Sequence, residues 1–151
     1  MADKMSAAEI CAAFEGVYAM QSWHDGDQVE YAPDADGRWV LMGGTVVSLL
    51  LKSAADRSGQ TIALFGHYVI EDGAFSYGYD GGSFFMQRPG GVGDPYPVPF
   101  GEMRRYEASR DGDTVTLAMA DGVADFRIVG DTVEYREGGS LMRRWRRTAT
   151  S

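Results

Sequence analysis

The segment FGEMRRYEAS, residues 100–109, brings together residues that can transfer protons and hold anions. Side chains alternate between the two faces of a β-strand, so Glu102, Arg104 and Tyr106 would share one face and Arg105 would lie on the other. A carboxylate can accept or return a proton, and a guanidinium can hold a carboxylate or carbonyl oxygen through paired hydrogen bonds. The face that turns toward the interior therefore decides whether this strand carries a site.

Three turns further along the chain allow the two faces to be assigned. Asp-Gly or Gly-Asp pairs between alternating segments predict two-residue hairpin turns at 111–112, 121–122 and 130–131. The inner row predicted by this threading is Tyr106, Leu117, Phe126 and Tyr135. The predicted outer row is Glu107, Thr116, Arg127 and Glu134. This register turns Glu102 and Arg104 inward.

An inward Arg104 needs a partner, because burying an unpaired charge is costly. It could close one mouth of a barrel by pairing with Glu102 or Glu137. It could instead anchor an acidic or carbonyl group of a bound molecule, for which a guanidinium fork is suited. The third alternative is a one-residue slip of the strand, which would turn every side chain to the other face.

The hairpin FGHYVIEDGAFSYGY offers a second candidate for acid–base chemistry, His67. A turn at 72–73 predicts that Tyr68 lies opposite Tyr77, and that His67 lies opposite Gly78 on the other face. If that other face lines a cavity, the small residues leave room for a substrate in front of the imidazole, which changes charge near neutral pH. Otherwise His67 is an exterior or edge histidine.

Other kinds of site find little support. His24, Asp25 and Asp27 lie in one tight turn that would splay them, so no metal site is expected. The sequence lacks a phosphate-binding loop and a Gly-x-Ser-x-Gly nucleophile elbow. Cys11 is the only cysteine, which excludes an internal disulfide, and its place in an expected helix does not favour thiol catalysis. We therefore expect no cofactor.

The composition predicts one globular domain over residues 1–151, with 44% hydrophobic and 12% aromatic residues. A net charge of −8 argues against a nucleic-acid partner, and the cluster MRRWRR is predicted to lie on a solvated final strand. No signal peptide is recognised, and LMGGTVVSLLL is too short and too rich in glycine to cross a membrane. With a lone cysteine, these features favour the cytoplasm and no membrane partner.

The turns also predict the architecture. Asp-Gly occurs six times, and short strands between such turns are typical of an antiparallel sandwich or barrel. Ser6 and Glu9 fit a capping box, which predicts a helix within residues 1–14. Strands are then expected over residues 15–147, with a tail at 148–151. Residues 88–100 hold four of the five prolines and are predicted to form an ordered loop or lid.

Several segments resemble bacterial lipocalin-like proteins of the calycin superfamily. The resemblance lies in FEGVYAMQSW, GRWVLMGGTVVSLLL, FGHYVIEDG and the closing RRWRR, although Tyr18 stands where the family has tryptophan. It implies an all-β, antiparallel up-and-down barrel of about eight to ten strands, with a short N-terminal helix at one end and a cavity for a small, largely apolar molecule. It also implies that an arginine of the closing segment packs across the aromatic residue of the first strand.

Two functions remain open. The first is non-catalytic binding of a small apolar or aromatic molecule that carries a carboxyl, carbonyl or hydroxyl group, with Arg104 at its polar end. The other residues expected to hold such a ligand are Tyr18, Tyr68, Tyr77, Tyr106, Phe126 and Tyr135. The second is a cofactor-independent lyase, dehydratase, isomerase or cyclase acting on an aromatic or polyketide-like substrate. There Glu102 or His67 would move a proton and Arg104 would stabilise negative charge on oxygen.

A third alternative is a structural or protein-binding barrel whose core is completely filled. The excess of inward polar groups is the feature of the sequence that argues against it. In any of the three cases, an acidic barrel with edge strands could form a homodimer.

Overall fold

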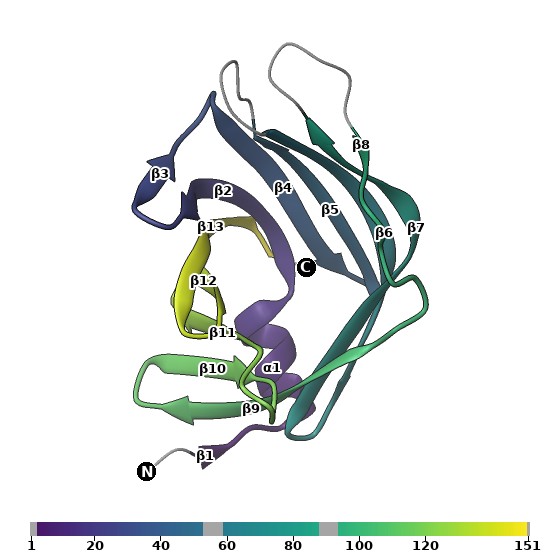
Figure 1. Cartoon of the computed structure of the whole chain (residues 1–151). Coiled ribbons are helices and arrows are strands. Elements are labelled where there is room, and N and C mark those ends of the chain that lie inside the picture. The colour runs from purple at the N-terminus through teal and green to yellow at the C-terminus, as the bar shows by residue number, and fades with distance from the viewer. Residues whose placement is uncertain (1–2, 53–58, 88–93, 151) are drawn as a thin grey trace.

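The computed structural model describes residues 3–52, 59–87 and 94–150, and it is a closed antiparallel β-barrel (Figure 1). One helix precedes the barrel, α1 (Ala7–Phe14). The ten strands that close the barrel are β2 (Gly16–Asp25), β4 (Ala35–Met42), β5 (Thr45–Lys52), β6 (Gly59–Glu71), β7 (Ala74–Gln87), β9 (Arg104–Asp111), β10 (Thr114–Ala118), β11 (Ala124–Val129), β12 (Thr132–Glu137) and β13 (Ser140–Ala149). Three short strands each pair with one strand of the barrel. They are β1 (Asp3–Lys4) beside β9, β3 (Gln28–Glu30) beside β2 and β8 (Asp94–Pro95) beside β7.

The barrel has the up-and-down order that the turns predict. Each of the ten strands pairs with the next one along the chain, and β13 returns to pair with β2. Pairing of β7 with β9 passes over β8 and completes the ring. The described helix is too short to span a membrane.

Most of the predicted registers are confirmed. Tyr135 pairs with Phe126, Leu117 pairs with Phe126 on its other side, and Tyr68 pairs with Tyr77. The register between β9 and β10 was predicted wrongly, because Asp111 continues the ladder and the turn is formed by residues 112–113. Leu117 therefore pairs with Ala108 rather than with Tyr106. A shift of two residues preserves the face, so Tyr106 still points inward.

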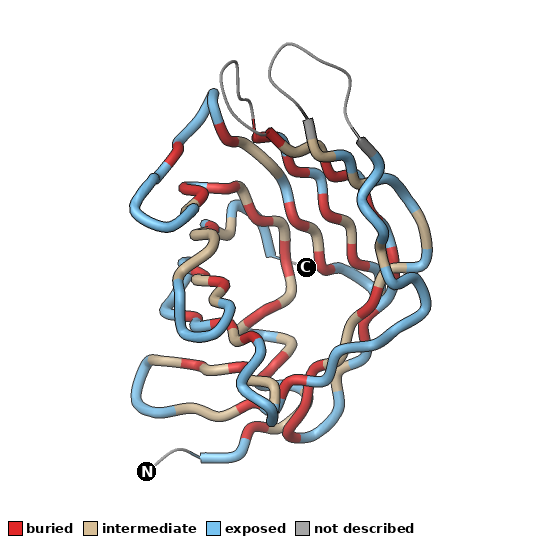
Figure 2. The backbone as a smooth tube through the Cα atoms, viewed as in Figure 1, coloured by how far each residue is buried: buried red, intermediate tan, exposed pale blue. Residues whose placement is uncertain are grey.

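The end of the barrel where β2 begins is filled and closed by α1, and we call it the helix end (Figure 1). Ser6 and Glu9 form the predicted capping box, although the helix begins only at Ala7. Phe14 is completely buried, with its ring centroid 5.0 Å from that of Phe75 and 5.3 Å from that of Phe126. Figure 2 shows buried and exposed positions alternating along the strands around this core.

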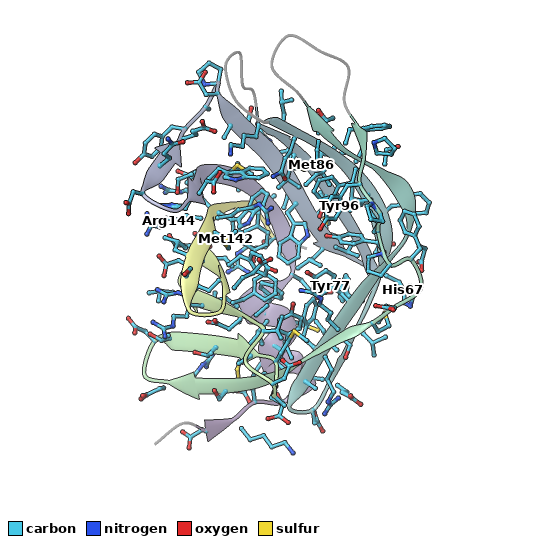
Figure 3. All side chains as sticks on the ribbon, viewed as in Figure 1. His67, Tyr77, Met86, Tyr96, Met142 and Arg144 are labelled. Carbon is cyan, nitrogen blue, oxygen red and sulfur yellow. The ribbon has the colours of Figure 1, made fainter. Side chains whose placement is uncertain are left out.

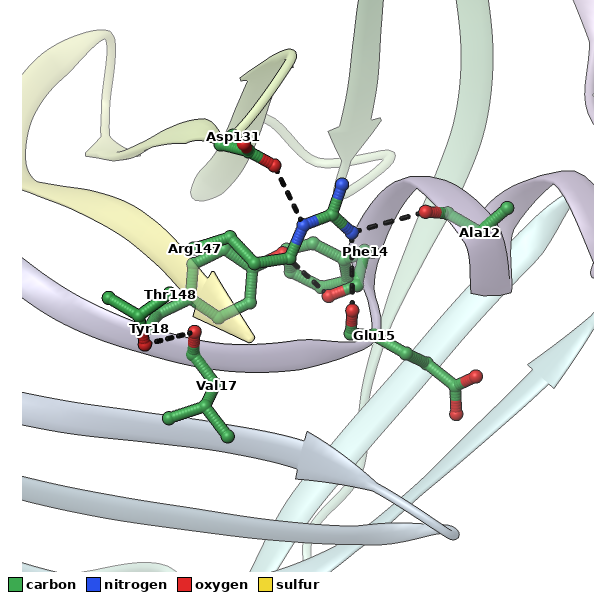
Figure 4. Close-up of polar contacts among 8 residues, drawn as sticks. All are labelled: Ala12, Phe14, Glu15, Val17, Tyr18, Asp131, Arg147 and Thr148. Carbon is green, nitrogen blue, oxygen red and sulfur yellow. Dashed lines mark hydrogen bonds and ion pairs between the residues drawn. The ribbon is translucent and has the colours of Figure 1, made fainter. Parts of the chain in front are cut away.

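An arginine of the closing strand ties the helix to the barrel. Arg147 pairs with Tyr18 across β13 and β2. Its guanidinium donates to the carbonyl oxygens of Ala12 (3.1 Å) and Glu15 (3.2 Å) and to Asp131 Oδ1 (3.1 Å) (Figure 4). A cation at the C-terminus of a helix satisfies carbonyl groups that have no partner within the helix.

Candidate ligand-binding cavity

A cavity of about 530 Å³ occupies the end of the barrel opposite α1. Strands β6 and β7 run for 13 and 14 residues, whereas β10, β11 and β12 run for only five or six. The long strands therefore rise above the short ones, and the side chains of the short strands cannot fill the space between them. The floor of the cavity is formed by Trp39, Tyr77, Phe126 and Trp145.

The two sides of the cavity differ in chemistry. One side, the apolar wall, consists mainly of Leu50, Ile62, Leu64, Phe84 and Met86 with the segment 96–99. The same strands also contribute Ser48, Gln60 and Tyr79, and the hydroxyls of Ser48 and Tyr79 bond to each other at 2.5 Å. The other side, the polar wall, consists of Glu102, Arg104, Tyr135, Glu137 and Arg143. Figure 3 shows Met86 and Tyr96 on one side, Met142 of β13 on the other and Tyr77 below them. A ligand in this space would meet hydrocarbon on one side and charge on the other.

The segment before β9 borders the apolar wall. Tyr96 stacks on Phe84 with ring centroids 4.6 Å apart, and its backbone N–H donates to the Phe84 carbonyl at 2.7 Å. Gly78 of β7 lets this segment approach, because a Cβ there would lie 2.2 Å from the Glu102 carbonyl oxygen. The part of the predicted proline-rich loop from residue 94 onward is thus ordered along the cavity, and residues 88–93 lie outside the described residues.

Arg143 projects from β13 into the polar wall. Its guanidinium carbon lies 4.5 Å from the ring centroid of Trp23 and 5.8 Å from that of Tyr135, distances typical of cation–π contacts. Its Nε is buried and has no hydrogen-bond partner in the described part of the chain. Burial lowers the pKa of this guanidinium, although the neighbouring Tyr135 and Glu137 oppose that shift.

Arg104 lies among tyrosine hydroxyls rather than carboxylates. Burial would lower its pKa, but the hydroxyls of Tyr106, Tyr135 and Tyr77 outweigh that effect and raise it. Within the described ranges, neither Arg104 nor Arg143 has a carboxylate within ion-pair distance. The predicted closure of the barrel mouth by an Arg104 ion pair with Glu102 or Glu137 is therefore wrong for these side chains.

The tyrosines beside Arg104 remain protonated at neutral pH. Burial raises the pKa of Tyr77, Tyr106 and Tyr135, and Glu137, whose Oε1 accepts the Tyr135 hydroxyl at 2.8 Å, raises that of Tyr135 further. The Tyr106 hydroxyl lies near enough to Arg104 and Tyr77 for both to affect its pKa, yet neither makes a hydrogen bond of good geometry with it. The hydroxyl of a completely buried side chain thus lacks a partner beside the cavity.

The structure brings five of the predicted site residues together. Glu102, Arg104, Tyr77, Phe126 and Tyr135 all line the cavity. The inward orientation predicted for Glu102 and Arg104 is therefore confirmed.

The other predicted residues lie elsewhere. Tyr18 and Tyr68 are buried at the helix end, where Tyr18 donates to the Phe14 carbonyl (2.7 Å) and Tyr68 donates to Glu15. Burial and then the Glu15 carboxylate raise the pKa of Tyr68 to about 12. Tyr106 lies beneath the cavity and does not line it.

His67 lies on the outer face of the barrel. Its side chain is exposed, and Nδ1 lies 2.8 Å from Asp80 Oδ2. Figure 3 shows it at the outer edge of the molecule, away from the cavity. The face of the hairpin that carries His67 is therefore not the face that lines the cavity, and this histidine shares no cavity with Glu102.

Sequence reasoning missed Arg143 and two tryptophans of the floor, Trp39 and Trp145. Placing all of MRRWRR on a solvated strand was wrong, because Arg143 lines the cavity whereas Arg144 forms an exterior ion pair with Glu134. The signal was present in the sequence: if Trp145 is buried, the residue two positions before it faces the same way.

Chemically, the cavity can hold an apolar body and present hydrogen-bond donors to oxygen atoms at its other side. No group of three or more His, Cys, Asp or Glu residues within residues 3–52, 59–87 and 94–150 is arranged to hold a metal ion. In comparisons with known proteins, no family model, no curated protein and no solved structure matches the chain.

Proposed function

We propose that the barrel binds one small, largely apolar or aromatic molecule in this cavity, with an oxygen-bearing group of the ligand on the polar wall. The observation that carries the proposal is the division of one cavity into an apolar wall and a wall with two guanidinium groups that lack carboxylate partners. The volume of about 530 Å³ lies within the range of small-molecule sites, roughly 300–1,000 Å³.

The closed end of the barrel supports a lipocalin-like assignment within this proposal. The closing strand supplies Arg147, which lies opposite Tyr18 and holds the end of the N-terminal helix. The resemblance to calycins implies an arginine beside the first-strand aromatic residue and a helix at one end of the barrel, and a sealed helix end leaves the other end for entry of a ligand. Because one fold serves many activities, the ligand has to be argued from the cavity itself.

A second function is favoured by one observation, the presence of Glu102 in the same cavity as Arg104 and two buried phenols. In a cofactor-independent lyase or isomerase, Glu102 would remove a proton next to a carbonyl group. Arg104, Tyr77 and Tyr135 would stabilise the negative charge that develops on the carbonyl oxygen. His67 takes no part in this alternative, because it lies outside the barrel.

The test of binding is thermal unfolding in the presence of aromatic ketones, esters, alcohols, fatty acids and aromatic acids. A ligand that binds only the folded state at a hundred times its Kd stabilises it by about 2.7 kcal/mol, which raises the unfolding midpoint. Leu64→Trp fills the cavity from the apolar wall and should abolish the shift. Phe65→Trp, at the exposed neighbouring position, should leave the shift unchanged.

No shift with any compound, or an equal loss in both variants, would remove the cavity as the site. Where a compound binds, Glu102→Gln separates the two functions. The variant should still bind in either case, and at least as tightly as the wild type when the ligand is an anion, but only an enzyme would lose turnover. If the compound is not converted by the wild type, binding alone remains.

A further inference from the structure

The polar wall holds more hydrogen-bond donors than acceptors. The Nε of Arg143 is buried without a partner in the described residues, and Arg104, which is exposed, lines the same cavity with no carboxylate within ion-pair distance. Buried polar groups in folded proteins nearly always have a partner, because leaving one unsatisfied costs roughly 1–3 kcal/mol. An unsatisfied guanidinium nitrogen beside a second arginine without a carboxylate partner therefore indicates that the cavity receives an acceptor from outside the chain.

Both guanidinium groups line the same cavity, and both lie near the phenols of Tyr135 and Tyr77. Arg143 is held between Trp23 and Tyr135, so its position does not depend on a ligand. A single group with two equivalent oxygen atoms could accept from both guanidinium groups at once.

The charges of the wall limit the charge of that group. The two guanidinium groups carry two positive charges. Glu137 accepts a hydrogen bond from Tyr135 and lies close enough to Arg143 to interact with its charge, so its carboxylate offsets one of them. Glu102 adds a further negative charge at the exposed edge of the cavity. One negative charge on the ligand is therefore favoured, and a second would be repelled by the two carboxylates.

Resting on the function proposed above, we propose that the ligand is a monocarboxylate bound as its anion. Its carboxylate lies between Arg104 and Arg143, and its apolar body lies against Leu64, Phe84 and Met86. The carboxylate supplies the acceptors that the polar wall lacks. The tyrosine hydroxyls beside it stay protonated and act as further donors.

The first measurement compares matched ligands by isothermal titration calorimetry. The aromatic set is hydrocinnamate, its amide hydrocinnamamide and phenethylphosphonate, and the aliphatic set is octanoate, octanamide and heptylphosphonate. Charge-assisted hydrogen bonds should make the carboxylate bind at least about tenfold more tightly than the amide of equal shape. Above the second pKa of the phosphonate, where it carries two negative charges, it should bind more weakly than the carboxylate. An amide that binds as tightly as its acid would overturn the proposal.

The second measurement uses neighbouring arginines as matched controls. Arg104→Met and Arg143→Met should abolish the preference for acid over amide. Arg105→Met and Arg144→Met should retain it, because those side chains form exterior ion pairs with Glu71 and Glu134. Equal loss in the inner and the outer variants would contradict the proposal, since a general change in charge would then explain the effect.

A third measurement guards against variants that merely fail to fold. Arg143 is half-buried, its Nε is shielded from water and it has no ion-pair partner, so an apolar side chain there removes the cost of keeping an unpaired charge from water. Arg143→Met should therefore raise the unfolding midpoint of the ligand-free protein while acid binding is lost. A lower midpoint would mean that Arg143 holds the fold together instead.

The proposal and the function on which it rests fail in different ways. If amides, esters and acids all bind the wild type equally, the cavity is a binding site without specificity for acids, and only this proposal falls. If no probe binds the wild type, both fall.

Discussion

The two ends of this barrel use the same residue types for opposite purposes. At the helix end, Tyr18 and Tyr68 are buried and each donates its hydroxyl to a partner, the Phe14 carbonyl and the Glu15 carboxylate. At the cavity end, Tyr106 lacks a well-formed hydrogen bond and Arg143 leaves its Nε unpaired. Satisfied polar groups stabilise a fold, whereas unsatisfied buried groups reduce its stability and call for an explanation. The polar groups of the helix end are therefore the better satisfied, and the binding that we propose belongs to the cavity end.

The largest expected effect tests this division with the same substitution at both ends. Leu41 is completely buried at the helix end, and Leu41→Ala should lower the free energy of unfolding by about 3 to 5 kcal/mol. Leu64 lines the cavity, so Leu64→Ala only enlarges a space that exists already and should cost about 1 to 2 kcal/mol. Urea unfolding of the ligand-free variants measures both. Equal losses would show that the cavity end is packed as tightly as the helix end.

A smaller effect is expected where the closing strand holds the helix. Arg147→Met removes the bonds to Ala12, Glu15 and Asp131 and leaves helix carbonyl groups without partners, which should cost about 1 to 3 kcal/mol. Arg146→Met, at the exposed neighbouring position, should change stability by less than about 0.5 kcal/mol. The same urea titration compares them. A loss in both variants would point to the net charge rather than to these contacts.

The smallest effect concerns pH and an ion pair on the outer surface. The Glu134 carboxylate accepts hydrogen bonds from Arg144 and Arg136, which lower its pKa below 4.5. The contribution of the ionised Glu134 carboxylate to the free energy of unfolding is therefore complete above pH 4.5. It is lost as the pH falls through the lower pKa that this carboxyl has in the folded state. Glu134→Gln should reduce the loss of stability between pH 6 and pH 3 by under about 1 kcal/mol. Unfolding midpoints across that range, unchanged by the variant, would contradict this assignment.

The strands from residue 104 to residue 137 were predictable because their turns are local. Asp-Gly and Gly-Asp turns set the pairing of β10 with β11 and of β11 with β12, and the period of two then assigns each side chain to a face. The error at 111–112 changed the partner of Leu117 but not the face of Tyr106, since two residues separate the two registers. The inward orientation of Glu102 and Arg104 followed for the same reason.

The cavity itself was not predictable from such local signals. Whether Tyr77 or His67 faces inward depends on the direction in which the sheet curves when β7 pairs with β9, and that pairing spans residues 88–103. Tyr18, Tyr68, Tyr77 and Tyr106 are all core-facing, yet of these four only Tyr77 lines the cavity, and its direct cross-strand partner Tyr68 does not.

By itself, the sequence determined the fold class, the hairpins and the alternation of faces, since turns and strand periodicity depend on neighbouring residues. The tertiary structure alone decided which end of the barrel is filled. That depends on the unequal lengths of strands far apart in the chain and on where α1 packs against the barrel. It also decided that Arg104 and Arg143, from β9 and β13, meet at one cavity. The two strands are brought to one cavity by closure of the ring, which no turn or local pattern encodes.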